Sequence, residues 1–277
     1  MVAPAIAVLA GVAVYPILGA MWLSLHRRVL VFRVNELIGF DNYAFMLQDA
    51  RFWSALGNTV YFTIVAVGLE LLLALPLALL LNRAFPGRGI LRAGVLIPWA
   101  IPTVVSAKLW AWLFNPEYGL INRLLPGTDV NWLGTPGYAL HAAIVVDVWK
   151  TTPFVALLIL AGLQGISEDL YKAARVDGAS NGRIFRSITL PLLKPAILLA
   201  LLFRTLDAFR VFDAIYVLTE GGPGNTTETL SIYAYKMLMR SGDFGYGSTL
   251  AVVTFLCVMA ISLVYLRLLG RSQEGER

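Results

Sequence analysis

The sequence predicts an all-α polytopic membrane protein with six transmembrane helices and one charged cytoplasmic loop. Of its 277 residues, 58% are hydrophobic and 14% are charged, whereas globular domains are nearer half apolar and a quarter charged. Apolar runs of about 20 residues, the length that crosses a bilayer core, recur along the chain. A charged stretch with helical character separates two of these runs. We therefore expect residues 1–277 to form a single transmembrane domain.

Hydropathy places six spans, and the apolar start of the chain supplies the first of them, because it lacks the basic beginning and the cleavage site of a signal peptide. The predicted spans cover approximately residues 2–25, 55–81, 89–114, 139–165, 191–218 and 247–269. Prolines within these runs predict kinks, since neighbouring helices can satisfy the carbonyls that a proline frees. These prolines are Pro16, Pro76, Pro98, Pro102 and Pro153.

The basic residues set the orientation, because Lys and Arg collect in the cytoplasmic loops of membrane proteins. The larger group is Arg83, Arg88, Arg92, Lys172, Arg175, Arg183, Arg186, Lys194, Arg267, Arg271 and Arg277. The smaller group is Arg27, Arg28, Arg33, Arg51, Arg123, Lys236 and Arg240. This bias predicts a multi-pass protein of the plasma or inner membrane with both termini in the cytoplasm. The scattered distribution of these residues argues against nucleic-acid binding, despite a net charge of +5.

The charged stretch, residues 166–190, is predicted to be a cytoplasmic elbow of two helices. Ser167 is a candidate N-cap for the first helix, and acidic residues follow it where the helix dipole favours them. Gly178 permits a turn through positive φ, and Ser180 can cap a second helix to about Ile188. Pro191 then begins the next span. Small alanines flanked by both charge signs favour contact with another protein, and an amphipathic loop on lipid headgroups is the alternative.

This elbow resembles the "EAA" loop of permease subunits in ATP-binding-cassette (ABC) importers. The matching residues are Ala173, Ala174, Asp177, Gly178, Ala179, Phe185, Leu190, Pro191 and Pro195, whereas Lys172 stands where that family usually has Glu. The stretches "LGNTVYFT", "LIPWAIPTVVSAKLWAWLFNPEYGLIN" and "RTLDAFRVFDAIYVLTEGGPGNTTETLSIYAY" extend the likeness over nearly the whole chain. The chain is most similar to the first of two permeases in disaccharide importers for maltose or trehalose. "WKTTPF" and "LLFRTLDAFR" point to the actinobacterial trehalose importers.

The resemblance implies a permease domain that forms half of a sugar path, with a coupling helix docked on an ATPase. The residues implied for coupling are Glu168, Ala173, Ala174, Asp177, Gly178 and Ala179. The implied partners are a second permease, two ATPase subunits, an extracytoplasmic solute-binding protein, membrane lipid and the sugar. ATP and Mg are expected to act in the ATPase subunits and not on this chain.

Ionisable residues inside the predicted spans need a partner or water, because each costs at least a few kcal/mol near the bilayer centre otherwise. They are Glu70, Lys108, Asp147, Lys150, Arg204, Asp207, Arg210 and Asp213. Four acids and four bases permit complete pairing, and several lie three residues apart, where side chains on a helix meet. These residues can line a path for a hydroxyl-rich solute, or they can link the helices structurally. The sequence leaves both interpretations open. The residues predicted to line the path are Lys108, Trp112, Arg204, Asp207, Arg210, Asp213 and Tyr216.

Enzyme motifs are missing from the sequence. It contains no G-x-x-x-x-G-K-[ST] phosphate loop, no H-E-x-x-H metal motif and no G-x-S-x-G nucleophile motif. We therefore expect a transport subunit with no catalytic residue, bound metal or cofactor. A permease for glycerol phosphate or an oligosaccharide, an ion-coupled secondary transporter and a membrane scaffold remain as alternatives. A secondary transporter would leave the elbow unexplained.

Overall fold

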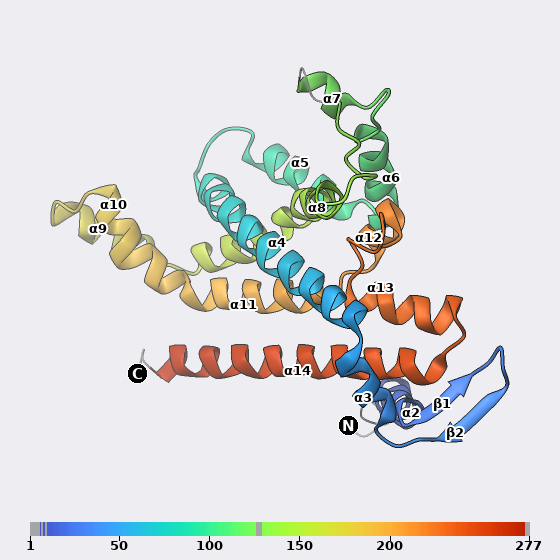
Figure 1. Ribbon diagram of the computed structural model, residues 1–277. Helices are drawn as coiled ribbons and strands as arrows, with labels where there is room; N and C mark the ends of the chain where they lie inside the picture. Colours follow the sequence, from blue (N-terminus) through green and yellow to red (C-terminus); the bar gives the residue numbers. More distant parts are fainter. Residues whose placement is uncertain (1–5, 7, 9, 126–128, 275–277) are drawn as a thin grey trace.

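The computed structural model describes residues 6, 8, 10–125 and 129–274 and is almost entirely helical (Figure 1). Val2 of the predicted first span and Arg277 of the larger basic group lie outside the described residues. The helices are η1 Ala10–Val14, α2 Tyr15–Ser24, α3 Asp41–Gln48, α4 Ala50–Asn82, α5 Arg88–Ala100, α6 Thr103–Leu113, α7 Leu120–Leu124, α8 Tyr138–Gln164, α9 Glu168–Val176, α10 Asn181–Ile184, η2 Phe185–Thr189, α11 Leu190–Phe209, α12 Asp213–Thr219, α13 Leu230–Tyr235, η3 Lys236–Arg240 and α14 Phe244–Glu274.

Four continuous helices of the described chain are long and apolar enough to cross a bilayer. They are Ala50–Asn82, Tyr138–Gln164, Asn181–Phe209 and Phe244–Gly270, with mean hydropathies of 2.6, 1.8, 1.6 and 2.4. A fifth is reached if α5 and α6 are counted as one span, and a shorter apolar helix covers Ala10–Ser24. The structure therefore supports a polytopic membrane fold, and the assignment of six spans stays a prediction.

The predicted third span, residues 89–114, is wrong as a continuous helix. The chain bends by 90° between α5 and α6. Ile101 has an extended backbone (φ −72°, ψ 134°), which is the conformation favoured immediately before a proline. Pro102 has no N–H to continue the helical ladder, and α6 begins directly after it. Pro102 therefore produces a break and not only a kink, whereas Pro98 lies inside α5.

The predicted fifth span, residues 191–218, is displaced toward the elbow. A helix runs without interruption from Asn181 to Phe209 through the π-helical turn η2, so the second elbow helix does not end near Ile188. In η2 the N–H of Leu190 bonds the carbonyl of Phe185. This wider turn shifts the hydrogen-bond register just ahead of Pro191, which lacks a donor. At the other end, Arg210 ends the helix and α12 begins at Asp213.

Helix α8 lies at the centre of the fold. In its most apolar window 67% of residues are buried, compared with 33% or less in the other three spanning helices. One apolar cluster joins α8 to α4 and α12 through Phe62, Ile144 and Ile215. A second cluster packs Ile159 of α8 against Leu193 of α11. The other helices expose large apolar side chains, as expected for surfaces that face lipid or another subunit.

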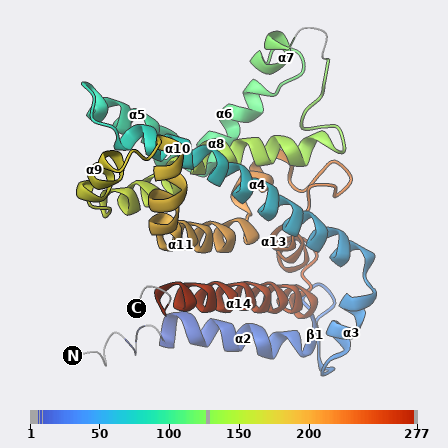
Figure 2. The same ribbon diagram turned by 90° about the vertical axis from the view of Figure 1, so that its left-hand side faces the viewer.

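A β-hairpin corrects the prediction of a purely helical chain. Strands β1 His26–Val29 and β2 Val34–Leu37 pair antiparallel directly after α2. Val29 bridges to Asp243 at the start of α14, so the hairpin is fixed to the end of two helices. It lies at the opposite end of the molecule from α9 and α10 (Figure 1). In Figure 2, α2 and α14 lie side by side below the other helices.

Candidate functional site

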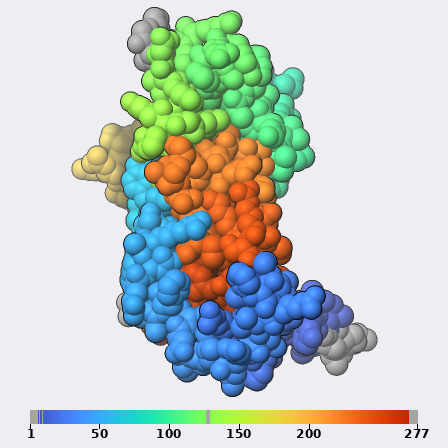
Figure 3. Space-filling model, turned by 45° about the vertical axis from the view of Figure 1, so that its right-hand side comes forward, coloured from blue at the N-terminus to red at the C-terminus, as the bar shows by residue number. Residues whose placement is uncertain are grey.

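Two interrupted helices meet at a polar pocket. The pocket has a volume of about 490 Å³ and lies where the α5–α6 break faces the α11–α12 break across α8. Figure 3 shows the segment after residue 210, in orange, between the green region of α6–α7 and the blue region near the N-terminus. The pocket is lined by residues 99–103, 207, 208 and 210–214 together with Asp147, Lys150 and Thr151.

Lys150 stabilises the first helix break. Its Nζ donates to the carbonyl oxygens of Ile101 at 2.5 Å and Trp99 at 3.3 Å. These carbonyls lie at the bend, where the helical donors are missing, and an unpaired buried carbonyl is costly. The indole of Trp99 also stacks on Phe154 of α8, with ring centroids 5.5 Å apart and an interplanar angle of 16°. These contacts of Lys150 and Trp99 therefore stabilise the conformation of the break, which forms one wall of the pocket.

A buried ion cluster forms the floor of the pocket. The Arg204 guanidinium donates to both oxygens of Glu70, at 2.5 and 2.6 Å, and to Asp147 at 2.8 Å and Asp207 at 2.6 Å. Thr151 donates to Glu70 at 2.7 Å. Arg204 and Glu70 are 2% and 0% exposed, so the centre of this charge-assisted network is away from solvent, and the network links α4, α8 and α11.

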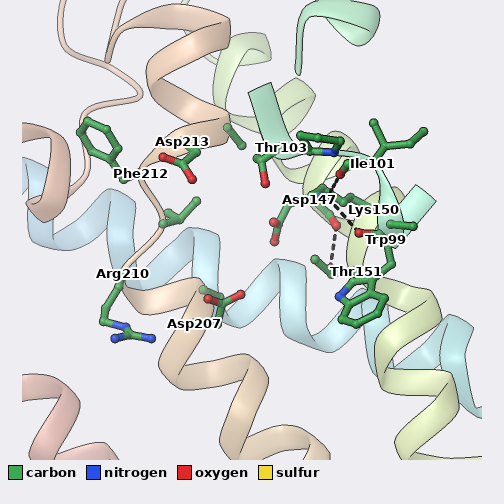
Figure 4. Close-up of a pocket in the computed structure, with 15 residues that line it drawn as sticks. Trp99, Ile101, Thr103, Asp147, Lys150, Thr151, Asp207, Arg210, Phe212 and Asp213 are labelled. Atoms are coloured by element: carbon green, nitrogen blue, oxygen red, sulfur yellow. Dashed lines mark hydrogen bonds between the residues drawn. The ribbon is translucent and has the colours of Figure 1, made fainter. Parts of the chain in front are cut away.

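Three carboxylates, those of Asp147, Asp207 and Asp213, line the pocket together with two cations, Lys150 and Arg210. The side chain of Asp207 is 68% exposed, and Figure 4 shows Asp147, Asp207 and Asp213 around a common space. Arg210 points away from them in this view and donates to the carbonyl of Leu206 at 3.0 Å. Carboxylates are acceptors for several hydrogen bonds each. The arrangement can therefore bind a neutral solute that carries many hydroxyl donors.

The elbow has the predicted local structure. The hydroxyl of Ser167 accepts from the N–H of Asp169 at 3.3 Å, which confirms Ser167 as the N-cap of α9. Gly178 has φ +77°, a conformation that favours glycine. The hydroxyl of Ser180 accepts from the N–H of Arg183 and begins α10.

The elbow projects from the end of the helical bundle (Figure 1), and much of its surface is open. Among the residues predicted to couple to the ATPase, four are exposed: Glu168, Ala173, Asp177 and Gly178. The other two, Ala174 and Ala179, are half-buried. Val176 is 87% exposed and Leu170 is 46% exposed. Apolar side chains in such a position suit contact with a partner.

Comparison with known proteins identifies the family to which this chain belongs. Residues 70–274 match the family model described as binding-protein-dependent transport system inner membrane component. The chain belongs to this family. It is 48% identical over 270 residues to the trehalose/maltose transport system permease protein MalF of Thermococcus litoralis, covering 96% of this chain and 91% of that one. It is 44% identical over 276 residues to the trehalose transport system permease protein SugA of Mycobacterium tuberculosis, covering 99% and 89%.

A solved structure shares the architecture of this permease. It is a chain in the crystal structure of a bacterial alginate ABC transporter in complex with an alginate pentasaccharide-bound periplasmic protein. The likeness has a TM-score of 0.83 and 25% identity, and it covers 96% of this chain and 91% of that chain. The resemblance to ABC importer permeases inferred from the sequence is thus confirmed.

The structure brings only part of the predicted path together. Asp207, Arg210 and Asp213 line the pocket, and Arg204 lies beneath it. The pair Arg204–Asp207 is present, whereas Asp147 contacts Arg204 and not Lys150. Whether these residues contact a solute stays a prediction.

Three predicted path residues do not line this pocket. Lys108 and Trp112 are exposed on α6, where Trp112 packs beside Tyr118 with ring centroids 6.2 Å apart. The ring of Tyr216 stacks on the ring of Phe212, with centroids 5.1 Å apart. Tyr216 therefore contacts a residue that lines the pocket. The prediction placed residues 89–114 on one span with proline kinks. The 90° bend redirects every side chain of α6.

The predicted path set left out Trp99, Thr103, Asp147, Lys150 and Thr151, which line the pocket, although Asp147 and Lys150 were among the ionisable residues noted inside the spans. A signal for the first two was the proline spacing of "PWAIP", because a helix break exposes polar backbone only where it lines a cavity or is buried in protein. Lys150 and Thr151 lie within one turn of Asp147, a charge inside a span. Grouping the polar residues of the fourth span would have found both.

Proposed function

We propose that this permease forms half of the translocation path of an ATP-driven importer for a neutral disaccharide of the trehalose or maltose type. The observation that carries the proposal is the carboxylate-lined pocket between two helix breaks. Its volume, about 490 Å³, lies in the range of small-molecule sites, about 300–1,000 Å³. The similarity to trehalose and trehalose/maltose permeases supports the sugar class.

The assembly that we propose contains a second permease, two ATPase subunits and an extracytoplasmic solute-binding protein. ATP hydrolysis takes place in the ATPase subunits, with Mg, and this chain transmits the movement. The exposed surface of α9 docks on an ATPase, and Asn181–Phe209 carries the motion toward the pocket as one continuous helix. Such rigid-body coupling alternates access to the path.

The orientation that we propose places α9 and both termini in the cytoplasm, with six spans in the membrane. In Figure 2 the ends of α2 and α14 that are farther from β1 lie on the same side of the view as α9. The basic residues of the elbow and of the α4–α5 loop then face the cytoplasm, in agreement with the charge bias of membrane proteins. The hairpin faces the extracytoplasmic side.

Two measurements test this proposal. Affinity purification from the native membrane is expected to yield two ATPase copies and one different permease with each copy of this chain. Reconstitution of that assembly with its solute-binding protein is expected to give ATP-dependent uptake of labelled trehalose or maltose. Isolation of this chain alone, with uptake that follows an ion gradient and not ATP, would refute it. If ATP-dependent uptake were seen only for an acidic sugar, the importer function would stand, but the proposal of a neutral disaccharide as substrate would be refuted.

A further inference from the structure

A second cavity lies beside the elbow, away from the polar pocket. It has a volume of about 460 Å³ and is bordered by the end of α4, the start of α5, the end of α8 and α9. Three cations, Arg88, Lys172 and Arg175, line it, and Glu168 is the single carboxylate in the lining. The cavity therefore carries an excess of positive charge at the end of the molecule that holds the elbow.

Helix α9 presents two different faces. Glu168, Lys172 and Arg175 follow the spacing i, i+4 and i+7, which places them on one side of a helix, and this side lines the cavity. Ala173 and Val176 lie on other parts of the helix surface and are exposed. Ala173 and Val176, which suit contact with an ATPase, are thus separate from the cavity lining, and Glu168 is the one predicted coupling residue that lies in both sets.

The cations of the cavity are available to a ligand. Within the described part of the chain, the guanidinium groups of Arg88 and Arg175 have no hydrogen bond or ion pair to protein. Lys172 pairs with Asp169 at 3.0 Å, and the two side chains are 66% and 86% exposed. An ion pair exposed to this extent contributes little and exchanges readily for a stronger anion.

We propose that this cavity binds a phosphate group, supplied by the headgroup of an anionic phospholipid or by a free phosphate compound. Arginine guanidinium groups bind phosphate through paired hydrogen bonds, and lysine adds a point charge. Asn82 ends the spanning helix α4 and Gln164 ends α8, and both line the cavity. The site therefore lies at the level where spanning helices leave the bilayer, where basic pockets bind lipid headgroups.

The proposal gives a reason for Lys172, the residue that departs from the usual glutamate of the elbow. A glutamate at this position would face Glu168 across one helical turn and would leave two cations and two anions in the lining, with no excess of positive charge. Lysine instead completes a cluster of three cations. A bound phosphate would hold α9 to the start of α5 at Arg88 and thereby fix the angle at which the elbow meets its partner.

The test measures ligand retention directly, so it does not depend on transport. The complete assembly is purified from mixed micelles of equimolar POPC and POPG, and retained lipid is identified by native mass spectrometry. Wild type and Lys172→Arg are expected to retain POPG, and Lys172→Glu and the double variant Arg88→Gln/Arg175→Gln are expected to lose it. Arg186→Gln is the matched control, because Arg186 is exposed on the elbow but lines a different cavity.

If the ligand is a free phosphate compound and not a lipid headgroup, the expected result is different. Wild type would then show no preference for POPG, and inorganic phosphate would raise its unfolding temperature in POPC alone, without an effect on Lys172→Glu. Either pattern supports the phosphate site and identifies the source. Equal POPG retention in all variants, an equal loss in Arg186→Gln, or no response to either probe would overturn the proposal.

Discussion

Arg204 and Glu70 are 134 positions apart in the sequence, yet their side chains form a two-point ion pair with distances of 2.5 and 2.6 Å. Both are almost fully buried. The pair connects α4 to α11 directly below the pocket, and Asp147 of α8 joins it. Helices α4, α8 and α11 are therefore tied at one point beside the pocket.

Removal of Glu70 is expected to destabilise the permease strongly. Glu70→Ala leaves a buried guanidinium without its closest partner, and the loss of one member of a buried pair costs about 3–5 kcal/mol. The measurement is thermal unfolding of the purified assembly in detergent. Glu36→Ala, an exposed acid on the hairpin, is the control. An equal effect of both variants would show that the pair adds nothing to stability.

Lys150→Met is expected to weaken the helix break. The carbonyls of Trp99 and Ile101 lose a charged donor, and each unsatisfied buried group costs about 1–3 kcal/mol. A lower unfolding temperature is expected, together with a change in Trp99 fluorescence. Lys194→Met replaces an exposed lysine of α11 and serves as the control. Unchanged fluorescence would indicate that the break holds without Lys150.

Asp207→Asn and Arg210→Gln are expected to impair uptake at normal protein levels. Asp207 offers its carboxylate to the pocket, and Arg210 comes from the second helix break. The measurement is labelled-sugar uptake normalised to the amount of assembled protein. Glu117→Gln changes an exposed acid outside the pocket and should leave uptake intact. Normal uptake in the two pocket variants would remove these residues from the path.

Ala174→Arg is expected to uncouple ATP hydrolysis from uptake. A bulky charged side chain on α9 would clash with the docking surface that we propose, whereas Ala174→Ser retains a small residue. ATPase rate and uptake should be measured on the same preparation. If Ala174→Arg transports as well as Ala174→Ser, the docking model is wrong.

Asp49 is expected to contribute stability that depends on pH. Burial raises its pKa, but hydrogen bonds from Tyr233 and Tyr246, at 2.6 and 2.7 Å, outweigh this effect and the pKa is lowered. A lowered folded-state pKa stabilises the fold above the ordinary pKa of 3.8, and this contribution is lost as the pH falls through the lowered value.

Asp49→Asn should therefore lower the unfolding temperature at neutral pH, by the equivalent of about 1–2 kcal/mol. The difference from wild type should shrink as the solution is acidified below pH about 4. Asp41→Asn, which changes another acid of the same segment, is the comparison. A difference that persists unchanged in acid would rule out the ionised form as the source.

Long helices and the elbow were predictable because their causes are local. Apolar length predicts α4, α8 and α14, and serine caps with a glycine turn predict the elbow. The hairpin was not predicted, since its short strands carry no clear alternation and its position depends on α14. The cluster in which Arg51 and Lys236 share the buried Glu228 was also missed. No local pattern brings these residues together.

The sequence by itself predicted several membrane spans and a charged elbow of two helices, because hydropathy and capping act over short distances, and the resemblance of its motifs indicated an importer permease. Only the tertiary structure decided which charged residues meet. It bent residues 89–114 by 90°, moved Lys108 and Trp112 out of the pocket, and paired Glu70 with Arg204. These choices depend on the packing of helices distant in the chain, where a buried charge must find a partner wherever the fold provides one.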